Sequence, residues 1–164
     1  MRYSENEVKD KKIITEFLKE EPFGTLGLVD KNKPYAVPVN FVYFNDKIYF
    51  HSARAGRKWE IIYKNANAFF LVAKQYSIIP AQTPCNVGAS YFSVMLEGTL
   101  RIVTDKTEKE TAFNTFIKKY APEAEHLSAQ QIDNYRSSLN TGMALFAIDI
   151  TSMSAKANAP ATKN

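Results

Sequence analysis

The 164-residue chain contains a single cysteine, Cys85, so it cannot form an internal disulfide bond. No apolar run approaches the roughly 18 residues that a membrane-spanning helix needs. The N-terminus also lacks the cationic and then apolar segments of a secretory leader. From these absences we expect a cytoplasmic protein without a membrane span, and the length favours one domain over residues 1–164.

The motifs of several large enzyme classes are missing as well. There is no G-x-S-x-G elbow, no Walker phosphate loop and no G-x-G-x-x-G fingerprint, which argues against a hydrolase, an NTPase and a Rossmann dehydrogenase. The histidines, His51 and His126, have no suitably spaced Cys, Asp or Glu, so no metal site is expected. The net charge of +4 comes from scattered residues and does not suggest a nucleic-acid partner.

What the chain does contain is a succession of strand and helix patterns. Alternating apolar residues predict six strands, at residues 23–29, 35–44, 47–52, 68–73, 89–103 and 143–150. Helices are predicted at residues 4–21, from residues 56–58 to Asn65, and from the capping residues Asp105 and Ser128 onward. Residues 78–88 read as a loop because they include two prolines and a glycine, and Gly98 predicts a bulge in its strand.

The order of these elements indicates an antiparallel meander. Polar turns follow the first two strands at once, which leaves no room for the crossover helices of a parallel sheet. The predicted fold is therefore mainly β, with six antiparallel strands closing on each other and helices packed outside. Residues 104–139 form a helical insertion in this scheme, and residues 159–164 form a flexible tail.

A cationic cluster, Arg54-Ala-Gly-Arg-Lys58, follows the third predicted strand. Gly56, Arg57 and Lys58 fall at the predicted start of the short helix, where unpaired backbone N–H groups and the helix dipole favour an anion. A phosphate is the natural guest for such a cluster. Taken alone, the cluster fits a solvated turn equally well.

His51 and Pro38 are the other candidate site residues. A histidine on a strand can contact a ligand or donate a proton near neutral pH, and it can also be purely structural. Proline inside YAVPVNFVY removes a ladder donor and predicts a sheet edge or a bulge. Such an edge can face a flat polar ligand, or the proline can simply protect the edge from aggregation.

In this order and spacing, the blocks FGTLGLVD, KPYAVPVNFVYFNDKIYFHSARAGRKWEII, AFFLVA and CNVGASYFSVMLEGTLRIV resemble the FMN-binding split-barrel superfamily. The nearest likeness is to the branch related to pyridoxamine 5'-phosphate oxidase that includes the 5-nitroimidazole reductases. The resemblance implies a six-stranded antiparallel split barrel that forms a homodimer, with FMN in each cleft between the protomers.

The same resemblance implies roles for individual residues. Val37, Pro38, Val39 and Asn40 would line the isoalloxazine ring, His51, Ser52 and Ala53 would border the ring and the ribityl chain, and Arg57 and Lys58 would hold the phosphate. Tyr91 and Ser93 would reach the flavin of the other protomer. His51 is the candidate proton donor. Phe92 stands where close relatives usually carry an arginine, and residues 152–158 (SMSAKAN) are similar to a closing glycine-lysine turn.

The function implied is that of an FMN-dependent oxidoreductase. Electrons would pass from a reduced nicotinamide or a similar donor through FMN to a small acceptor, for example a nitroaromatic compound. Two alternatives stay open on the sequence. The first is a flavin carrier, store or sensor without turnover, and the second is a barrel that binds haem or a deazaflavin.

Overall fold

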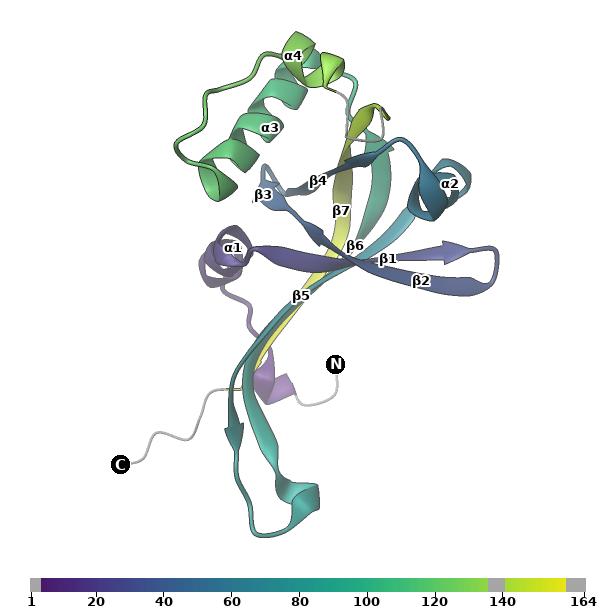
Figure 1. The fold of residues 1–164 in the computed structure, drawn as a ribbon. Coiled ribbons are helices and arrows are strands. Elements are labelled where there is room, and N and C mark those ends of the chain that lie inside the picture. Colours follow the sequence, from purple (N-terminus) through teal and green to yellow (C-terminus); the bar gives the residue numbers. More distant parts are fainter. Residues whose placement is uncertain (1–3, 136–140, 159–164) are drawn as a thin grey trace.

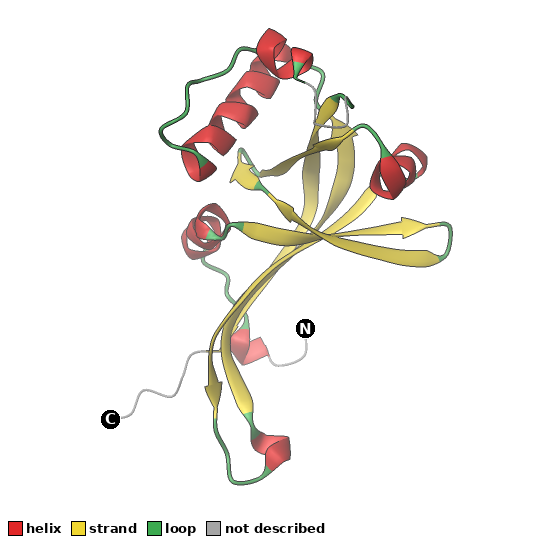
Figure 2. Ribbon diagram, viewed as in Figure 1, coloured by secondary structure: helices red, strands yellow, loops and turns green. Residues whose placement is uncertain are grey.

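The computed structural model describes residues 4–135 and 141–158. In these residues, seven antiparallel strands form one sheet in the order β2-β1-β5-β6-β7-β4-β3, with helices packed around it (Figures 1 and 2). The strands are β1 (Phe23–Asp30), β2 (Lys33–Asn40), β3 (Val42–Phe44), β4 (Lys47–Ala53), β5 (Asn67–Ile79), β6 (Gly88–Ile102) and β7 (Met143–Asn158). The helices are α1 (Lys11–Glu20), α2 (Gly56–Lys64), α3 (Lys106–Tyr120) and α4 (Ala129–Asn134), with short 3-10 turns η1 (Ser4–Asn6) and η2 (Pro84–Asn86).

The additional strand arises because residues 35–44 are not one strand. β2 pairs with β1 and β3 pairs with β4, so the chain changes partners at Phe41. β2 and β3 are the two edges of the sheet, and this single residue joins them. Among the described residues the sheet therefore curls until its edges meet at one point, and its hydrogen-bond ladder does not close there.

The strands β5, β6 and β7 extend well beyond the barrel and form an arm (Figure 1). The loop predicted from residue 78 starts only after Ile79, because β5 pairs with β6 along almost its whole length. The closing turn predicted at residues 152–158 is wrong, since these residues continue β7 alongside β6. The bulge predicted at Gly98 is confirmed by a register shift between Glu97 and Gly98. A side chain at Gly98 would place its Cβ 2.4 Å from the Asp149 carbonyl oxygen.

The helices start and end near their sequence signals, with one exception. The first helix begins at Lys11 instead of Ser4, because the Asp10 side chain caps it by accepting a hydrogen bond from Lys12 N at 2.8 Å. The predicted cap at Ser128 is present as a complete capping box with Gln131. In the described part of the chain, every helix is too short or too polar to cross a membrane.

The core inside the curled sheet is rich in aromatic residues. Phe41, Phe50, Phe70 and Phe146 are all fully buried. The predicted alternation along β6 is confirmed, since Phe92, Val94 and Leu96 face this core. Phe92 packs on Phe17 of α1, with 4.5 Å between the ring centroids. Phe92, where the resemblance implies an arginine, is thus a packing residue in this chain.

Candidate functional site

The sheet splits where β2 and β4 separate. Val42 of β3 pairs with Tyr49 of β4. If this ladder continued for two more residues, Asn40 would lie opposite His51. Instead β2 turns away to pair with β1, and the end of β4 pairs on its other side with β7, His51 opposite Leu145. Among the described residues, two strand edges without ladder partners therefore flank the split, while the strands still contact each other. Pro38 lies on such an edge, as the sequence predicts.

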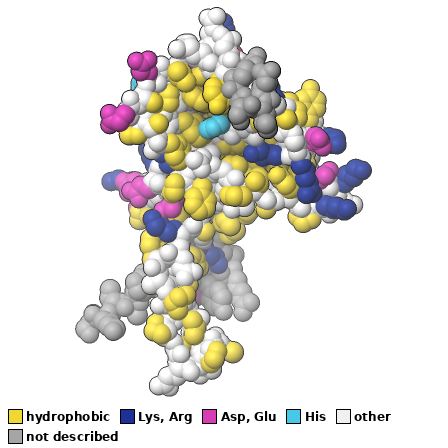
Figure 3. Space-filling view, in the orientation of Figure 1, with side chains coloured by type: hydrophobic (Ala, Val, Ile, Leu, Met, Phe, Trp, Pro, Cys, Tyr) yellow, Lys and Arg dark blue, Asp and Glu magenta, His cyan; other side chains and the backbone are white. Residues whose placement is uncertain are grey.

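The start of α2 lies directly after β4 and beside β2. Ala55 provides no side-chain cap for this helix, and Gly56 has a φ of +82° with open space where a side chain would point. The Arg57 guanidinium lies over the Tyr35 ring of β2, 4.8 Å from its centroid, and so connects the helix to the other wall of the split. Figure 3 shows Lys and Arg side chains gathered over the α2 and β1–β2 end of this face.

Two titratable groups of this region have shifted pKa values. Burial lowers the pKa of Lys58, whose ammonium group lies 6.0 Å from the centroid of the Phe50 ring. The pKa of His51 is lowered first by the loss of hydration in its surroundings and second by the positive charge of Lys58. Since the usual pKa of histidine is about 6.5, His51 is neutral at pH 7.

The structure brings most of the predicted site residues to this split. Val37, Pro38, Val39 and Asn40 lie on the free strand β2, His51, Ser52 and Ala53 end β4, and Arg57 and Lys58 begin α2. Arg54 is already engaged, because its backbone N–H donates to Gly142 O at 2.9 Å and its Nε donates to Met143 O at 3.0 Å. The sequence prediction had counted this arginine among the anion-binding residues.

Tyr91 and Ser93 are not part of this arrangement within one protomer. They lie on β6 in the arm, where their register neighbours on β7 are Asn158 and Lys156. Both side chains are half-buried on the face of β6 opposite the core. The predicted contribution from a second protomer stays a prediction.

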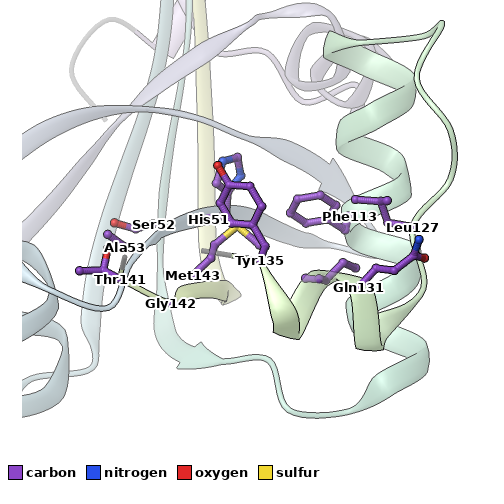
Figure 4. Close-up of a pocket in the computed structure, with 11 residues that line it drawn as sticks. His51, Ser52, Ala53, Phe113, Leu127, Gln131, Tyr135, Thr141, Gly142 and Met143 are labelled. Atoms are coloured by element: carbon purple, nitrogen blue, oxygen red, sulfur yellow. The ribbon is translucent and has the colours of Figure 1, made fainter. Parts of the chain in front are cut away.

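A cavity of about 520 Å³ lies at the end of β4, against α3 and α4 (Figure 4). Its lining is mostly apolar and consists of His51, Ser52, Ala53, Phe113, Leu127, Gln131, Ile132, Tyr135, Thr141, Gly142 and Met143. The sequence predicted the helix after Asp105 without any binding role, and this cavity was not predicted. The available signal was the apolar stripe of that helix, which includes Phe113 and does not distinguish a core contact from a pocket wall.

Comparison with known proteins supplies the family. The family model described as pyridoxamine 5'-phosphate oxidase matches residues 10–157. No curated protein matches the chain. Solved structures share the fold across nearly the whole chain, at identities that show the fold alone.

Three of these structures illustrate the range of relatives. A candidate 5-nitroimidazole antibiotic resistance protein from Bacteroides thetaiotaomicron has a TM-score of 0.73 and 23% identity, covering 92% of this chain and 85% of its own. The flavocytochrome Anf3 from Azotobacter vinelandii has a TM-score of 0.79 and 21% identity, with coverages of 98% and 73%. An FAD and heme binding protein from Mycobacterium smegmatis has a TM-score of 0.76 and 18% identity, with coverages of 94% and 75%.

The family match spans both walls of the split, the start of α2 and the arm. The fold built from the strand pairings is also the one that these structures share. The chain therefore belongs to the pyridoxamine 5'-phosphate oxidase family.

Proposed function

We propose that the protein is an oxidoreductase that binds FMN in the split between β2 and β4. The observation that carries this proposal is the position of the α2 start, which sets two cations and uncapped N–H groups beside the free edge of β2. An extended flat ring with a phosphate at one end needs both features together. Among the relatives that share the fold, one is a flavocytochrome and another is an FAD and heme binding protein.

The phosphate would bind at Gly56, Arg57 and Lys58. The backbone N–H groups of the first turn of α2 have no side-chain cap, and the helix dipole adds positive potential there. A dianionic phosphate would restore the interactions that Lys58 loses through burial, and its charge would return the pKa of this lysine toward its ordinary range. Arg57 can exchange its contact with the Tyr35 ring for a charge-assisted hydrogen bond to the phosphate.

The ring would lie along Val37, Pro38, Val39 and Asn40, and residues 51–53 would border it. The exposed Pro38 and Asn40 alternate with the more buried Val37 and Val39, so the strand offers its backbone edge and the polar side chain of Asn40. His51 is neutral at pH 7, which favours contact with the ring over delivery of a proton. When bound, FMN would supply the redox chemistry, a transfer of two electrons from a reduced nicotinamide or similar donor, which would be oxidised, to a small acceptor, which would be reduced.

We propose further that the active form is a homodimer. Tyr91 and Ser93 lie on the arm, so they can reach a flavin only if that flavin belongs to another protomer. The arm also carries the exposed apolar side chains Tyr76, Ile78 and Val87, which a partner subunit would cover. Light scattering tests this arrangement, and a monomer that still holds FMN would contradict it.

The visible spectrum of the purified protein tests the cofactor directly. A flavin band is expected, and a haem Soret band would remove the FMN proposal. Bleaching of the bound flavin by NADH or NADPH, followed by reoxidation with a nitroimidazole, is expected of an oxidoreductase. If neither nucleotide bleaches the flavin, a carrier or sensor role replaces turnover.

Lys58→Ala tests the phosphate contact. The loss of one charge-assisted hydrogen bond costs about 1.5 to 3 kcal/mol, so FMN affinity should fall tenfold or more in a fluorescence titration. Lys64→Ala is the matched control, because Lys64 is an exposed lysine in the last turn of the same helix. Unchanged retention of FMN in the double variant Arg57→Ala, Lys58→Ala would show that the cluster is only a solvated turn.

A further inference from the structure

We propose that the cavity between the end of β4 and the α3–α4 pair binds an uncharged, planar aromatic molecule that carries hydrogen-bond acceptors. This molecule would be the electron acceptor of the proposed flavin reaction, and that part of the inference rests on the proposed function. The class of ligand follows from the cavity itself. Binding measured without flavin therefore tests the ligand class separately from the proposed function.

The size and the walls of the cavity suit a small aromatic molecule. About 520 Å³ lies within the range of roughly 300 to 1,000 Å³ that is usual for ligand pockets. Phe113, Leu127, Ile132 and Met143 supply apolar walls, and the sticks in Figure 4 converge from β4, α3, α4 and the start of β7. The Phe113 ring lies 5.7 Å from the His51 ring, so two flat groups already border the space.

The described part of the lining offers no charged partner to an ionic guest. Among the described residues that border the cavity, none is Asp, Glu, Lys or Arg. His51, the titratable imidazole among them, has a lowered pKa and is neutral at pH 7. A carboxylate or phosphate entering this cavity would lose hydration without gaining a partner of opposite charge. The anion-binding cations, Arg57 and Lys58, line the split and are absent from the cavity wall.

The described polar groups of the lining include hydrogen-bond donors. The side-chain oxygen of Gln131 is occupied in the capping box, where it accepts hydrogen bonds from Ser128 N at 2.9 Å and from Ser128 Oγ at 2.8 Å. Gln131 therefore offers its amide N–H groups to a ligand. Ser52 adds a hydroxyl, which can also donate. An aromatic molecule with carbonyl, ester or nitro oxygens matches these donors.

The helical wall of the cavity is held in place before any ligand binds. Asn114 joins α3 to the start of α4 through two hydrogen bonds with the backbone of Leu127, at 3.1 Å and 2.9 Å. Lys109 adds a 2.6 Å ion pair with Asp133. Next to Lys109 in the first turn of α3, Glu108 accepts hydrogen bonds from Tyr49 and Arg101 of the barrel. A wall fixed in this way lowers the ordering cost of binding.

The cavity and the split share one wall. His51, Ser52 and Ala53 line the cavity and also form the end of β4 that borders the split. A molecule in the cavity would thus lie against the same three residues that we propose beside the flavin ring. This adjacency is what makes the cavity the acceptor site of the proposed reaction.

Methyl naphthoate and naphthoate test the inference, because they share one aromatic body and differ in charge. Binding is measured by fluorescence titration on the purified protein, both with its flavin content as isolated and after flavin removal. Methyl naphthoate should bind at least tenfold more tightly than naphthoate in the flavin-free protein. Leu127→Lys should move this preference at least tenfold toward naphthoate, since Leu127 anchors α4 through its backbone and lines the cavity with its side chain.

Ile13→Lys is the matched control, because Ile13 is an exposed apolar residue of α1 outside the cavity lining, and it should leave the preference unchanged. If Leu127→Lys does not fold, Phe113→Leu replaces it. This variant should lower the affinity for methyl naphthoate at least threefold through the loss of ring stacking. Equal affinity for both probes, or no binding of methyl naphthoate to flavin-free protein, would overturn the inference. A protein that binds no flavin yet prefers methyl naphthoate would overturn the proposed function alone.

Discussion

The Tyr120 hydroxyl fastens the last turn of α3 to the barrel at Phe41, and its removal should lower the free energy of unfolding by about 2 kcal/mol. The oxygen accepts a hydrogen bond from Phe41 N at 3.0 Å. Its proton is directed to the carbonyl oxygens of Phe41, at 2.7 Å, and of Pro22. Phe41 belongs to no strand and is fully buried, so its N–H depends on this side chain, while its carbonyl also accepts from Lys119.

The magnitude follows from what Tyr120→Phe leaves behind. The phenyl ring can keep its stacked contact with Phe116, at 5.8 Å between centroids, so little packing is lost. The buried Phe41 N–H, however, loses its partner, and an unsatisfied buried donor costs about 1 to 3 kcal/mol. For a chain of this size, each kcal/mol lowers Tm by roughly 2 to 4 °C, so a fall of about 4 to 8 °C is expected.

Urea unfolding followed by circular dichroism measures this effect. One fixed protein concentration is used for all variants, so that any contribution from subunit association is the same in each. Tyr63→Phe is the control, because the Tyr63 side chain is 78% exposed and should contribute nothing measurable. The reasoning is refuted if Tyr120→Phe costs less than about 0.5 kcal/mol, a value usual for surface changes. Equal losses in both variants would refute it too.

Three further changes test other contacts. Burial lowers the pKa of Lys119 to about 8, against about 10.4 in an unfolded chain, so the penalty for holding its charge should disappear as pH rises between these values. The wild type should therefore gain stability relative to Lys119→Met from pH 8 to 10 in urea unfolding. Gly98→Ala should lower the unfolding free energy by about 1 to 3 kcal/mol, because the new Cβ meets the Asp149 carbonyl. Asn114→Ala should weaken methyl naphthoate binding at least threefold, since α4 loses its hold on α3 at Leu127.

Each of these results has a contrary outcome. A constant stability difference between wild type and Lys119→Met across this pH range would mean that the lysine is not held in a poorly hydrated site. A Gly98→Ala variant as stable as the wild type would mean that β7 relaxes around the bulge at no cost. Asn114→Ala with wild-type affinity for methyl naphthoate would mean that other contacts alone hold the cavity wall.

Local signals in the sequence predicted the features that depend on neighbouring residues. The cap at Ser128 needs only Gln131 three residues later, and Gly98 predicted a bulge because a glycine inside a strand pattern is typical of one. Pro38 indicated a sheet edge, since proline cannot complete a ladder on both sides. The alternation of apolar and polar residues along β6 predicted which face of the strand is buried, because successive side chains of a strand point to opposite faces.

Features that depend on distant partners were not predictable in this way. The strand predicted at residues 68–73 continues to Ile79, because β6 lies beside residues 74–79. The split at Phe41 arises because residues 35–44, which read as one strand, pair with two different strands, β1 before Phe41 and β4 after it. The cavity depends on how α3 and α4 meet β4, and the stripe that contains Phe113 is compatible with simple packing. Such contacts are decided by tertiary geometry, which a residue pattern does not encode locally.

The split and the cavity have a common structural origin at Phe41. A chain that changes from one strand partner to another leaves backbone polar groups without a ladder, and burial makes such groups costly. Tyr120 and Lys119 satisfy them from the last turn of α3, with the Lys119 ammonium donating to Phe41 O at 3.1 Å. The helical insertion that forms the cavity wall is thus the element that stabilises the opening of the sheet. Tyr120→Phe should consequently weaken methyl naphthoate binding as well as stability, whereas Gly98→Ala, whose new side chain meets β7 outside the cavity lining, should affect stability alone.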